Sequence, residues 1–235
     1  MGRISINLLI FSLSVTLFLT AEAQDNIIKT SVSGFAIGDF SISYERKTSD
    51  NQSANLRIGY FQPTVSPFIG EKTITPSDYT FKDSEGALQA SLEYRWYTKK
   101  QGLRGFYYGP YLRYYAIRAE YGDNIRSDNF NVSGSYNSFG TGMQLGYQFL
   151  INNIFSVDLS FFGAGIDYNT INLVYTTGIQ GFDYNTIVAD VSEVFEDLPY
   201  FEKRLKNKVS PNNLTSRIPF LFPGLKAGIT IGVAF

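Results

Sequence analysis

The chain has 235 residues, of which 17% are charged, and its formal net charge is −1, which gives no overall electrostatic bias toward nucleic acid. It contains neither cysteine nor histidine. Disulfides are therefore excluded, as are catalytic mechanisms that depend on a histidine base or a cysteine nucleophile.

The first 23 residues have the features of an export signal. Arg3 supplies a positive charge, residues 8–19 are apolar, and Ala21-Glu22-Ala23 gives the small-x-small pattern of a cleavage site. The apolar run, about 12 residues long, is too short to cross a bilayer comfortably as a helix. We predict a cleaved signal peptide at residues 1–23 and an exported domain at residues 24–235.

Beyond the signal, apolar and polar side chains alternate with a period of two. Such alternation places successive side chains on opposite faces of a strand. The alternating segments are residues 28–36, 40–45, 54–60, 88–97, 106–114, 138–149, 155–161 and 224–235. Residues 28–36 show the weakest pattern. The sequence therefore predicts eight strands.

The connections between these segments alternate in length. Residues 48–53, 99–104 and 152–153 are short and polar, whereas residues 63–86, 122–135 and 170–219 are long; residues 38–39 are a tight exception. Short turns on one side and long loops on the other are typical of outer-membrane barrels. We predict an all-β fold, an antiparallel up-and-down transmembrane β-barrel with eight strands. An extra hairpin beginning at residues 171–176 would make ten.

Two features favour an apolar face directed toward lipid. The polar face is rich in glycine, which suits a crowded eight-strand lumen. Tyr94, Trp96, Phe106 and Tyr108 flank one short turn on the apolar face, where an interfacial aromatic girdle is expected. A soluble, lipocalin-like barrel would instead direct its apolar face inward, and it is the alternative.

The same alternation predicts which charged residues face the lumen. They are Lys29, Glu45, Arg57, Glu93, Arg95, Arg113, Asp158 and Lys226. Charges of mixed sign in a narrow lumen are expected to pair and fill it. We interpret the set as a structural salt-bridge network, with a selectivity or gating cluster as the alternative.

Residues 185–209 differ from the rest of the chain. Ile187, Val191, Val194, Phe195 and Leu198 recur at helical spacing, with acidic residues early and basic residues late. We predict a short amphipathic helix in the last long loop, packed over the barrel mouth. Contact with a protein or with lipopolysaccharide phosphates is the other interpretation.

The terminal segment GLKAGITIGVAF has Leu225, Ile229, Ile231, Val233 and Phe235 on one face. It resembles the carboxy-terminal assembly signal of outer-membrane barrels. The segments GDFSISYERKTSDNQSANLRIGY and GFYYGPYLRYYAI resemble a family of small bacterial outer-membrane proteins known only as a domain of unknown function. That family is similar to OmpA-like and OmpX-like eight-strand barrels. The resemblance implies outer-membrane lipids and the barrel-assembly machinery as partners.

Sequence motifs for catalysis, phosphate binding and metal binding were not found. We therefore expect a non-enzymatic outer-membrane protein without a cofactor, a metal or a nucleic-acid partner, which supports the envelope or presents loops to a partner. The alternatives are a narrow channel or transport component of the outer membrane and a soluble ligand-binding barrel of the periplasm.

Overall fold

A computed structural model describes residues 25–62, 81–83, 87–99, 102–125, 128–193 and 195–235. The predicted signal peptide, residues 1–23, lies outside these ranges, as does most of the long connection at residues 63–86.

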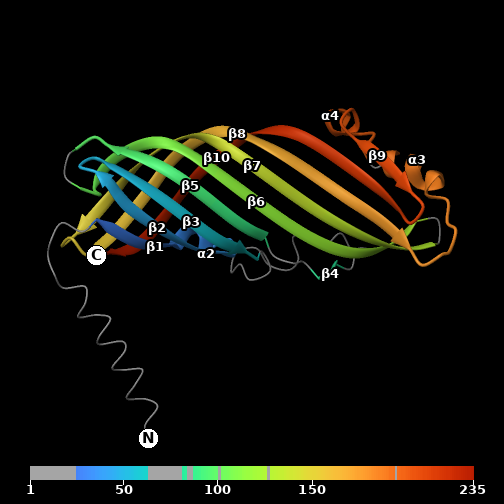
Figure 1. The fold of residues 1–235 in the computed structure, drawn as a ribbon, viewed down its shortest axis with the longest axis horizontal. Helices are drawn as coiled ribbons and strands as arrows, with labels where there is room; N and C mark the ends of the chain where they lie inside the picture. The colour runs from blue at the N-terminus through green and yellow to red at the C-terminus, as the bar shows by residue number, and fades with distance from the viewer. Residues whose placement is uncertain (1–24, 63–80, 84–86, 100–101, 126–127, 194) are drawn as a thin grey trace, which may run out of the picture.

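Eight antiparallel strands follow one another around a closed ring (Figure 1). They are β1 (Asn26–Ser31), β2 (Asp39–Ser49), β3 (Gln52–Phe61), β5 (Ala87–Tyr97), β6 (Gly105–Ile125), β7 (Asp128–Ile151), β8 (Phe155–Thr177) and β10 (Asn213–Ala234). The ring closes where β1 pairs with the end of β10, with Ile27 opposite Ala234. The predicted antiparallel up-and-down order and the number of strands in the ring are confirmed. Residues 171–176 belong to β8, so they do not begin an extra hairpin.

Two short strands lie beside this ring. β4 (Phe81–Asp83) pairs with β6, and β9 (Lys206–Ser210) pairs with the start of β10. Each attaches to a part of its partner strand that extends past the ring.

Half of the ring is much longer than the other half. β6, β7, β8 and β10 have 21, 24, 23 and 22 residues, whereas β1, β2, β3 and β5 have 6, 11, 10 and 11. The pairing of β5 with β6 ends at Leu88 and Ala116, and β6 continues in register with β7 to Ile125. Residues 117–125, 128–136, 171–177 and 213–218 thus form a curved overhanging sheet (Figure 1).

The overhanging sheet corrects two loop predictions. Residues 122–135 and the two ends of residues 170–219 were predicted as connections because they are rich in Asn, Ser, Thr and Gly. In the structure they are largely strand, paired residue by residue with their neighbours. A ladder that is already in register extends through residues of low strand propensity because the neighbouring strands supply their hydrogen bonds.

A bulge in β8 changes which side chains face outward. Phe162 pairs with Leu145 and Ser160 pairs with Gly146, so Phe161 is an extra residue. Phe161 and Phe162 are consequently both exposed, although neighbours in a regular strand point to opposite faces. After the bulge the outward positions are even-numbered and include Ile166 and Tyr168.

The first strand was predicted over residues 28–36, but in the structure β1 ends before residue 36, at Ser31. A short helix, α2 (Val32–Phe35), follows β1. The Ser31 hydroxyl accepts a hydrogen bond from the backbone N–H of Gly34 at 3.0 Å and caps this helix.

The predicted helix at residues 185–209 is correct only in its first part. The segment contains the 3₁₀ turn η3 (Tyr184–Ile187), α3 (Val188–Glu193) and α4 (Pro199–Glu202), and then becomes strand β9. Ile187 and Val191 are buried with Tyr184 against Val132 and Leu214 of the overhanging sheet. Leu198 is exposed, and the placement of Val194 is outside the described residues. Within the described ranges, none of the helices has the length and apolar character required to cross a membrane.

Candidate functional site: the charged interior of the ring

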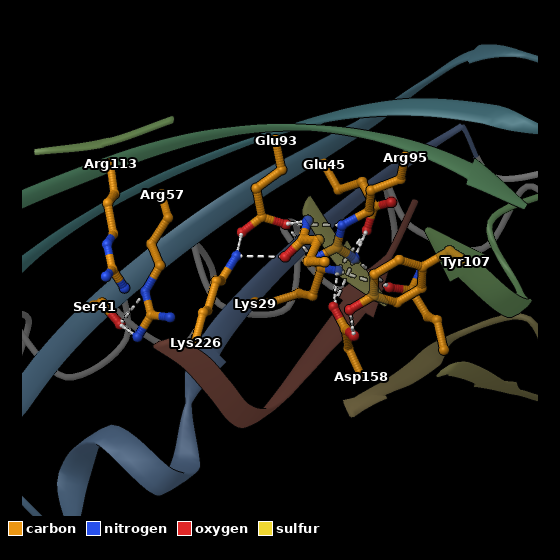
Figure 2. Close-up of polar contacts among 12 residues, drawn as sticks. Lys29, Ser41, Glu45, Arg57, Glu93, Arg95, Tyr107, Arg113, Asp158 and Lys226 are labelled. Atoms are coloured by element: carbon orange, nitrogen blue, oxygen red, sulfur yellow. Dashed lines mark hydrogen bonds and ion pairs between the residues drawn. The ribbon is translucent and has the colours of Figure 1, made fainter. Parts of the chain in front are cut away.

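The eight charged residues predicted to face inward lie inside the ring (Figure 2). Lys29, Glu45, Glu93, Arg95 and Asp158 are at most 3% exposed. Arg57, Arg113 and Lys226 are partly buried; Figure 2 shows Arg57 and Arg113 to one side of the other charges, with Lys226 between them and Glu93. Apolar side chains occupy the alternate positions and face outward. The period-two pattern therefore identified the two faces of the strands.

Three of the eight form the centre of one network. The Lys29 ammonium group donates to Glu45, to Gln148 Oε1 at 2.7 Å and to Asp158 Oδ2 at 2.8 Å. Arg95 binds the same aspartate through Nη1 at 2.7 Å and binds Glu93 through Nη2 at 2.6 Å. Two cations thus share Asp158, and each also reaches a second carboxylate.

Tyrosine hydroxyls and amides satisfy the remaining carboxylate oxygens. Tyr97 donates to Glu45 at 2.6 Å, and Tyr107 donates to Asp158 at 2.8 Å while its ring lies 4.3 Å from the Arg95 guanidinium. Gln144 donates to Glu93 at 2.9 Å, and Lys226 also donates to Glu93. A buried ion pair is favourable only when such additional hydrogen bonds complete its geometry.

Every strand of the ring contributes to this network, which we call the central network. Its members are Lys29 (β1), Glu45 (β2), Ser53 (β3), Glu93, Arg95 and Tyr97 (β5), Tyr107 (β6), Gln144 and Gln148 (β7), Asp158 (β8) and Lys226 (β10). Three cations face three carboxylates, so its formal charge is zero. The network ties all eight strands together across the interior.

Two further ion pairs lie nearer the overhanging sheet. Arg57 Nη2 binds Asp39 at 2.8 Å, and Arg57 Nε donates to Ser41 at 2.9 Å. Arg113 forms a two-point contact with Asp167 and donates from Nη1 to the backbone oxygen of Leu225 at 2.7 Å. Arg113 therefore connects β6, β8 and β10.

Sequence reasoning missed both acidic partners of these arginines. Asp39 was placed in a connection, although it has the same parity as Ser41 and Glu45 and could have been found by extending the pattern. Asp167 could not be found by parity, because the bulge at Phe161 moves the inward positions of β8 from even to odd numbers. The inward amides of Gln144 and Gln148, which bind the charged groups, were not predicted as their partners.

One end of the interior is closed by a small core. Ile27, Tyr97, Leu103, Tyr107 and Ala234 are each at most 1% exposed and pack together at the end of the ring where the chain terminates. The side chain of Gln148 donates to the Leu103 backbone oxygen at 2.7 Å and joins this core to the central network. The core and the network together seal that end.

The predicted interfacial aromatics gather on the outside near the same end. The rings of Tyr94 and Trp96 are 5.2 Å apart, and those of Trp96 and Tyr108 are 5.8 Å apart. Phe106 is exposed on the same strand as Tyr108.

The predicted assembly-signal residues lie on the last strand, with Leu225, Ile229, Ile231 and Val233 exposed on its outer face. Phe235 exchanges backbone hydrogen bonds with Asn26, at 2.8 and 3.1 Å, at the seam between β10 and β1. What reads this segment stays a prediction.

The chemistry of the interior is that of paired charges and hydrogen bonds. Among the residues that the structure describes, no group of three or more His, Cys, Asp or Glu is arranged to hold a metal ion. Glycine lines the wall where neighbouring atoms leave no room for a side chain: a Cβ at Gly142 would lie 2.2 Å from the Ala164 backbone oxygen and 2.7 Å from the Tyr111 hydroxyl.

Comparison with known proteins identifies the family to which the chain belongs. The family model for a protein of unknown function, DUF3575, matches residues 8–178, more than half of the chain. The chain belongs to the DUF3575 family. In this DUF3575 member the match covers β1 through β8, and the helical segment and β10 lie beyond it. Neither the curated proteins nor the solved structures contain a match to the chain.

Proposed function

We propose that this protein is a β-barrel of the bacterial outer membrane, without enzymatic activity, which supports the envelope or presents its overhanging sheet and the segment at residues 185–209 to a partner. The observation that carries the proposal is the apolar exterior of the ring. Ile42, Ile58 and Leu92, on three neighbouring strands, are 66%, 56% and 50% exposed. Exposed apolar patches of this extent mark surfaces that contact lipid or protein.

The apolar exterior continues around the ring. Its larger members are Ile28, Phe40, Ile42, Tyr44, Leu56, Ile58, Tyr60, Leu88, Leu92, Phe106, Tyr108, Leu112, Tyr114, Phe139, Met143, Leu145, Phe149, Phe155, Phe161, Phe162, Ile166, Leu225, Ile229, Ile231 and Val233. A soluble ligand-binding barrel would direct such side chains inward and its charges outward. The reversed distribution favours the membrane-embedded form, with lipids of the outer membrane as the surrounding solvent.

The sealed end favours a structural role over conduction. Eight strands leave an interior that side chains just fill, and here the central network spans it from β1 to β10. The narrow-channel alternative requires ions to pass that network. It predicts reproducible single-channel steps in planar bilayers that change in Arg95→Ala or Arg113→Ala, whereas the sealed barrel gives no steady conductance.

The remaining parts of the proposal concern export and assembly. Residues 1–23 direct export and are cleaved, and the terminal strand with Phe235 is read by the barrel-assembly machinery. The relation to OmpA-like and OmpX-like barrels belongs to the same proposal. The segment at residues 185–209 is the candidate contact with a protein or with lipopolysaccharide.

Fractionation of the producing bacterium tests the compartment. We expect the full-length protein in the outer-membrane fraction, as a band whose gel migration changes on boiling. Protease applied to intact cells should cut at Lys203 or Arg204 if that segment lies outside. Recovery in the soluble fraction without detergent would overturn the proposal.

A further inference from the structure

A cavity of about 440 Å³ lies inside the ring, on the side of the central network that faces the overhanging sheet. Its lining combines both faces of β10, because it includes the inward Lys226 together with the outward Leu225 and Ala227. The exposed Ile37, which follows α2, lines it as well. The lining thus extends to the exposed residues Ile37, Leu225 and Ala227, which lie where α2 faces β10.

The pairing of β10 shows where the wall is interrupted. On the side away from β8, β10 pairs with β9 at residues 213–217 and with β1 at residues 230–234. No described strand pairs with residues 218–229 on that side. The long edge of β10 is thus open over the stretch that lines the cavity.

The sequence of β10 is suited to an open edge. Ile229 directs its backbone N–H toward α2, and Phe235 directs its backbone N–H toward β1. The backbone N–H groups of odd-numbered β10 residues therefore point to this open side. Pro219 and Pro223 are odd-numbered and have no N–H to leave unpaired.

Side chains satisfy other groups of the edge. Tyr200 donates to the Leu221 oxygen at 2.8 Å, Arg113 donates to the Leu225 oxygen at 2.7 Å, and the Ser33 hydroxyl accepts from Ile229 at 3.0 Å. The opening is therefore built into the sequence of this strand.

The inner wall of the cavity is rich in hydrogen-bond donors. Arg57, Arg113 and Lys226 line it, with Asp39 as the acidic member of the lining. The carboxylates that pair with Arg113 and Lys226, Asp167 and Glu93, lie behind these cations and outside the lining. Three cations and one carboxylate thus line this wall of the cavity.

Two hydroxyls of the lining lack partners. The Tyr111 side chain is 1% exposed, and its hydroxyl has no hydrogen-bond partner among the described residues. The Ser91 hydroxyl is likewise buried and unpaired within that part of the chain. Buried polar groups of proteins are nearly always satisfied, so these two hydroxyls are hydrogen-bonding capacity beside the cavity that the described residues leave unused.

We propose that this cavity binds an amphiphile with an anionic head group. The carboxylate or phosphate head lies against Arg57, Arg113 and Lys226, and the apolar chain leaves between α2 and β10 over Leu225, Ala227 and Ile37. Guanidinium and ammonium groups are the usual protein ligands of both anions. The direction of the chain rests on the proposed function, in which the outside of this opening is hydrocarbon; the head-group site does not.

Equilibrium dialysis of the purified full-length protein in a nonionic detergent tests the proposal, with radiolabelled octanoate as the probe and a detergent-only chamber as the background. We expect one saturable site. Acetate and inorganic phosphate test a free anion and octanol tests the chain alone, and each should compete at least ten times more weakly than octanoate. Equal competition by phosphate or acetate would show a simple anion site, and equal competition by octanol would show a simple apolar one; either overturns the proposal.

Two variants test the two ends of the ligand. Arg57→Gln should weaken octanoate binding at least tenfold, with Lys47→Gln as the control because Lys47 pairs with Asp25 and does not line the cavity. Ala227→Phe, at the opening, should weaken it similarly, with Val233→Phe on the same outer face as the control. Unchanged binding in either variant contradicts the proposal, and Ala227→Phe keeps the test valid if Arg57→Gln does not fold.

The proposed ligand and the proposed membrane location can be contradicted independently of each other. A protein that fractionates with the outer membrane but does not bind octanoate contradicts the ligand alone. A protein that binds octanoate but fractionates as soluble contradicts the membrane location alone.

Discussion

Asp158 is the residue on which the central network depends most. It accepts from Lys29 at 2.8 Å, from Arg95 at 2.7 Å and from Tyr107 at 2.8 Å, and it is 3% exposed. Removing one partner of a buried ion pair leaves an uncompensated charge, whereas an exposed pair contributes little. The interior of this ring should therefore respond very differently from its surface to the loss of one charge.

Replacing Asp158 tests that difference. We expect Asp158→Asn to lower the free energy of unfolding by about 3–5 kcal/mol, because Lys29 and Arg95 lose their shared carboxylate. Urea unfolding of the protein in detergent measures the change. The control is Asp25→Asn, which removes an outer pair with Lys47 and should cost less than about 1 kcal/mol. Equal losses in the two variants would show that the network does not stabilise the ring.

Gly109 is a second residue whose identity is set by its surroundings. A Cβ at this position would lie 1.8 Å from the backbone oxygen of Tyr94, so an added methyl group must displace a strand. We expect Gly109→Ala to cost about 1–3 kcal/mol, the usual range for overpacking. In Gly178→Ala nothing lies within 4 Å of the new Cβ, and the unfolding free energy should stay within about 0.5 kcal/mol of the original. The urea midpoints of the two variants measure this difference in stability.

At the scale of elements, the segment between β8 and β10 forms a core of its own. Tyr184, Ile187 and Val191 pack with Val132 and Leu214 on the overhanging sheet, apart from the core formed by Tyr97 and Tyr107. The two cores share no described residue. The segment should therefore loosen without opening the ring.

Substitution in α3 tests this independence. We expect Val191→Asp to speed tryptic cleavage within residues 199–208, because a charge at a 2% exposed position breaks the core that Val191 forms with Tyr184 and Ile187. The temperature at which gel migration changes should stay within a few degrees of the original value. The matched control is Ala189→Asp on the exposed side of the same helix. A lowered transition temperature in Val191→Asp would show that the two cores fold together.

The elements also show how far sequence reasoning reaches. Alternation located the eight strands of the ring and the eight inward charges, because one polar and one apolar face impose a period of two. It missed the bulge at Phe161, and with it Asp167, because one inserted residue inverts the parity of everything that follows. It missed the ends of the long strands, because Asn, Ser and Gly are common in both loops and edge ladders. The cavity beside β10 depends on where β1 and β9 end along β10. Alternation within one strand does not show where a neighbouring strand ends.

At the scale of the whole molecule, the ring is inverted relative to a water-soluble fold. Its interior holds a neutral set of paired charges, and its exterior holds Ile42, Ile58 and Leu225 at 66%, 56% and 70% exposure. In water these side chains would stay exposed and would contribute little to the stability of the fold. In hydrocarbon the same arrangement leaves few backbone groups unpaired, because neighbouring strands pair around the ring and side chains bind groups on the free edge of β10.

A single charge on the exterior distinguishes the two environments. In a lipid bilayer, Ile42→Arg should lower the free energy of unfolding by about 2–4 kcal/mol if Ile42 lies near the midplane, whereas an arginine on a water-exposed strand face is nearly neutral. Ile179→Arg is the control, because Ile179 is 48% exposed beyond the end of β8 and outside the ring. Urea unfolding of both variants in liposomes supplies the comparison. If Ile42→Arg costs no more than Ile179→Arg, the exterior of the ring does not face hydrocarbon at that depth, and the apolar belt requires a protein partner instead.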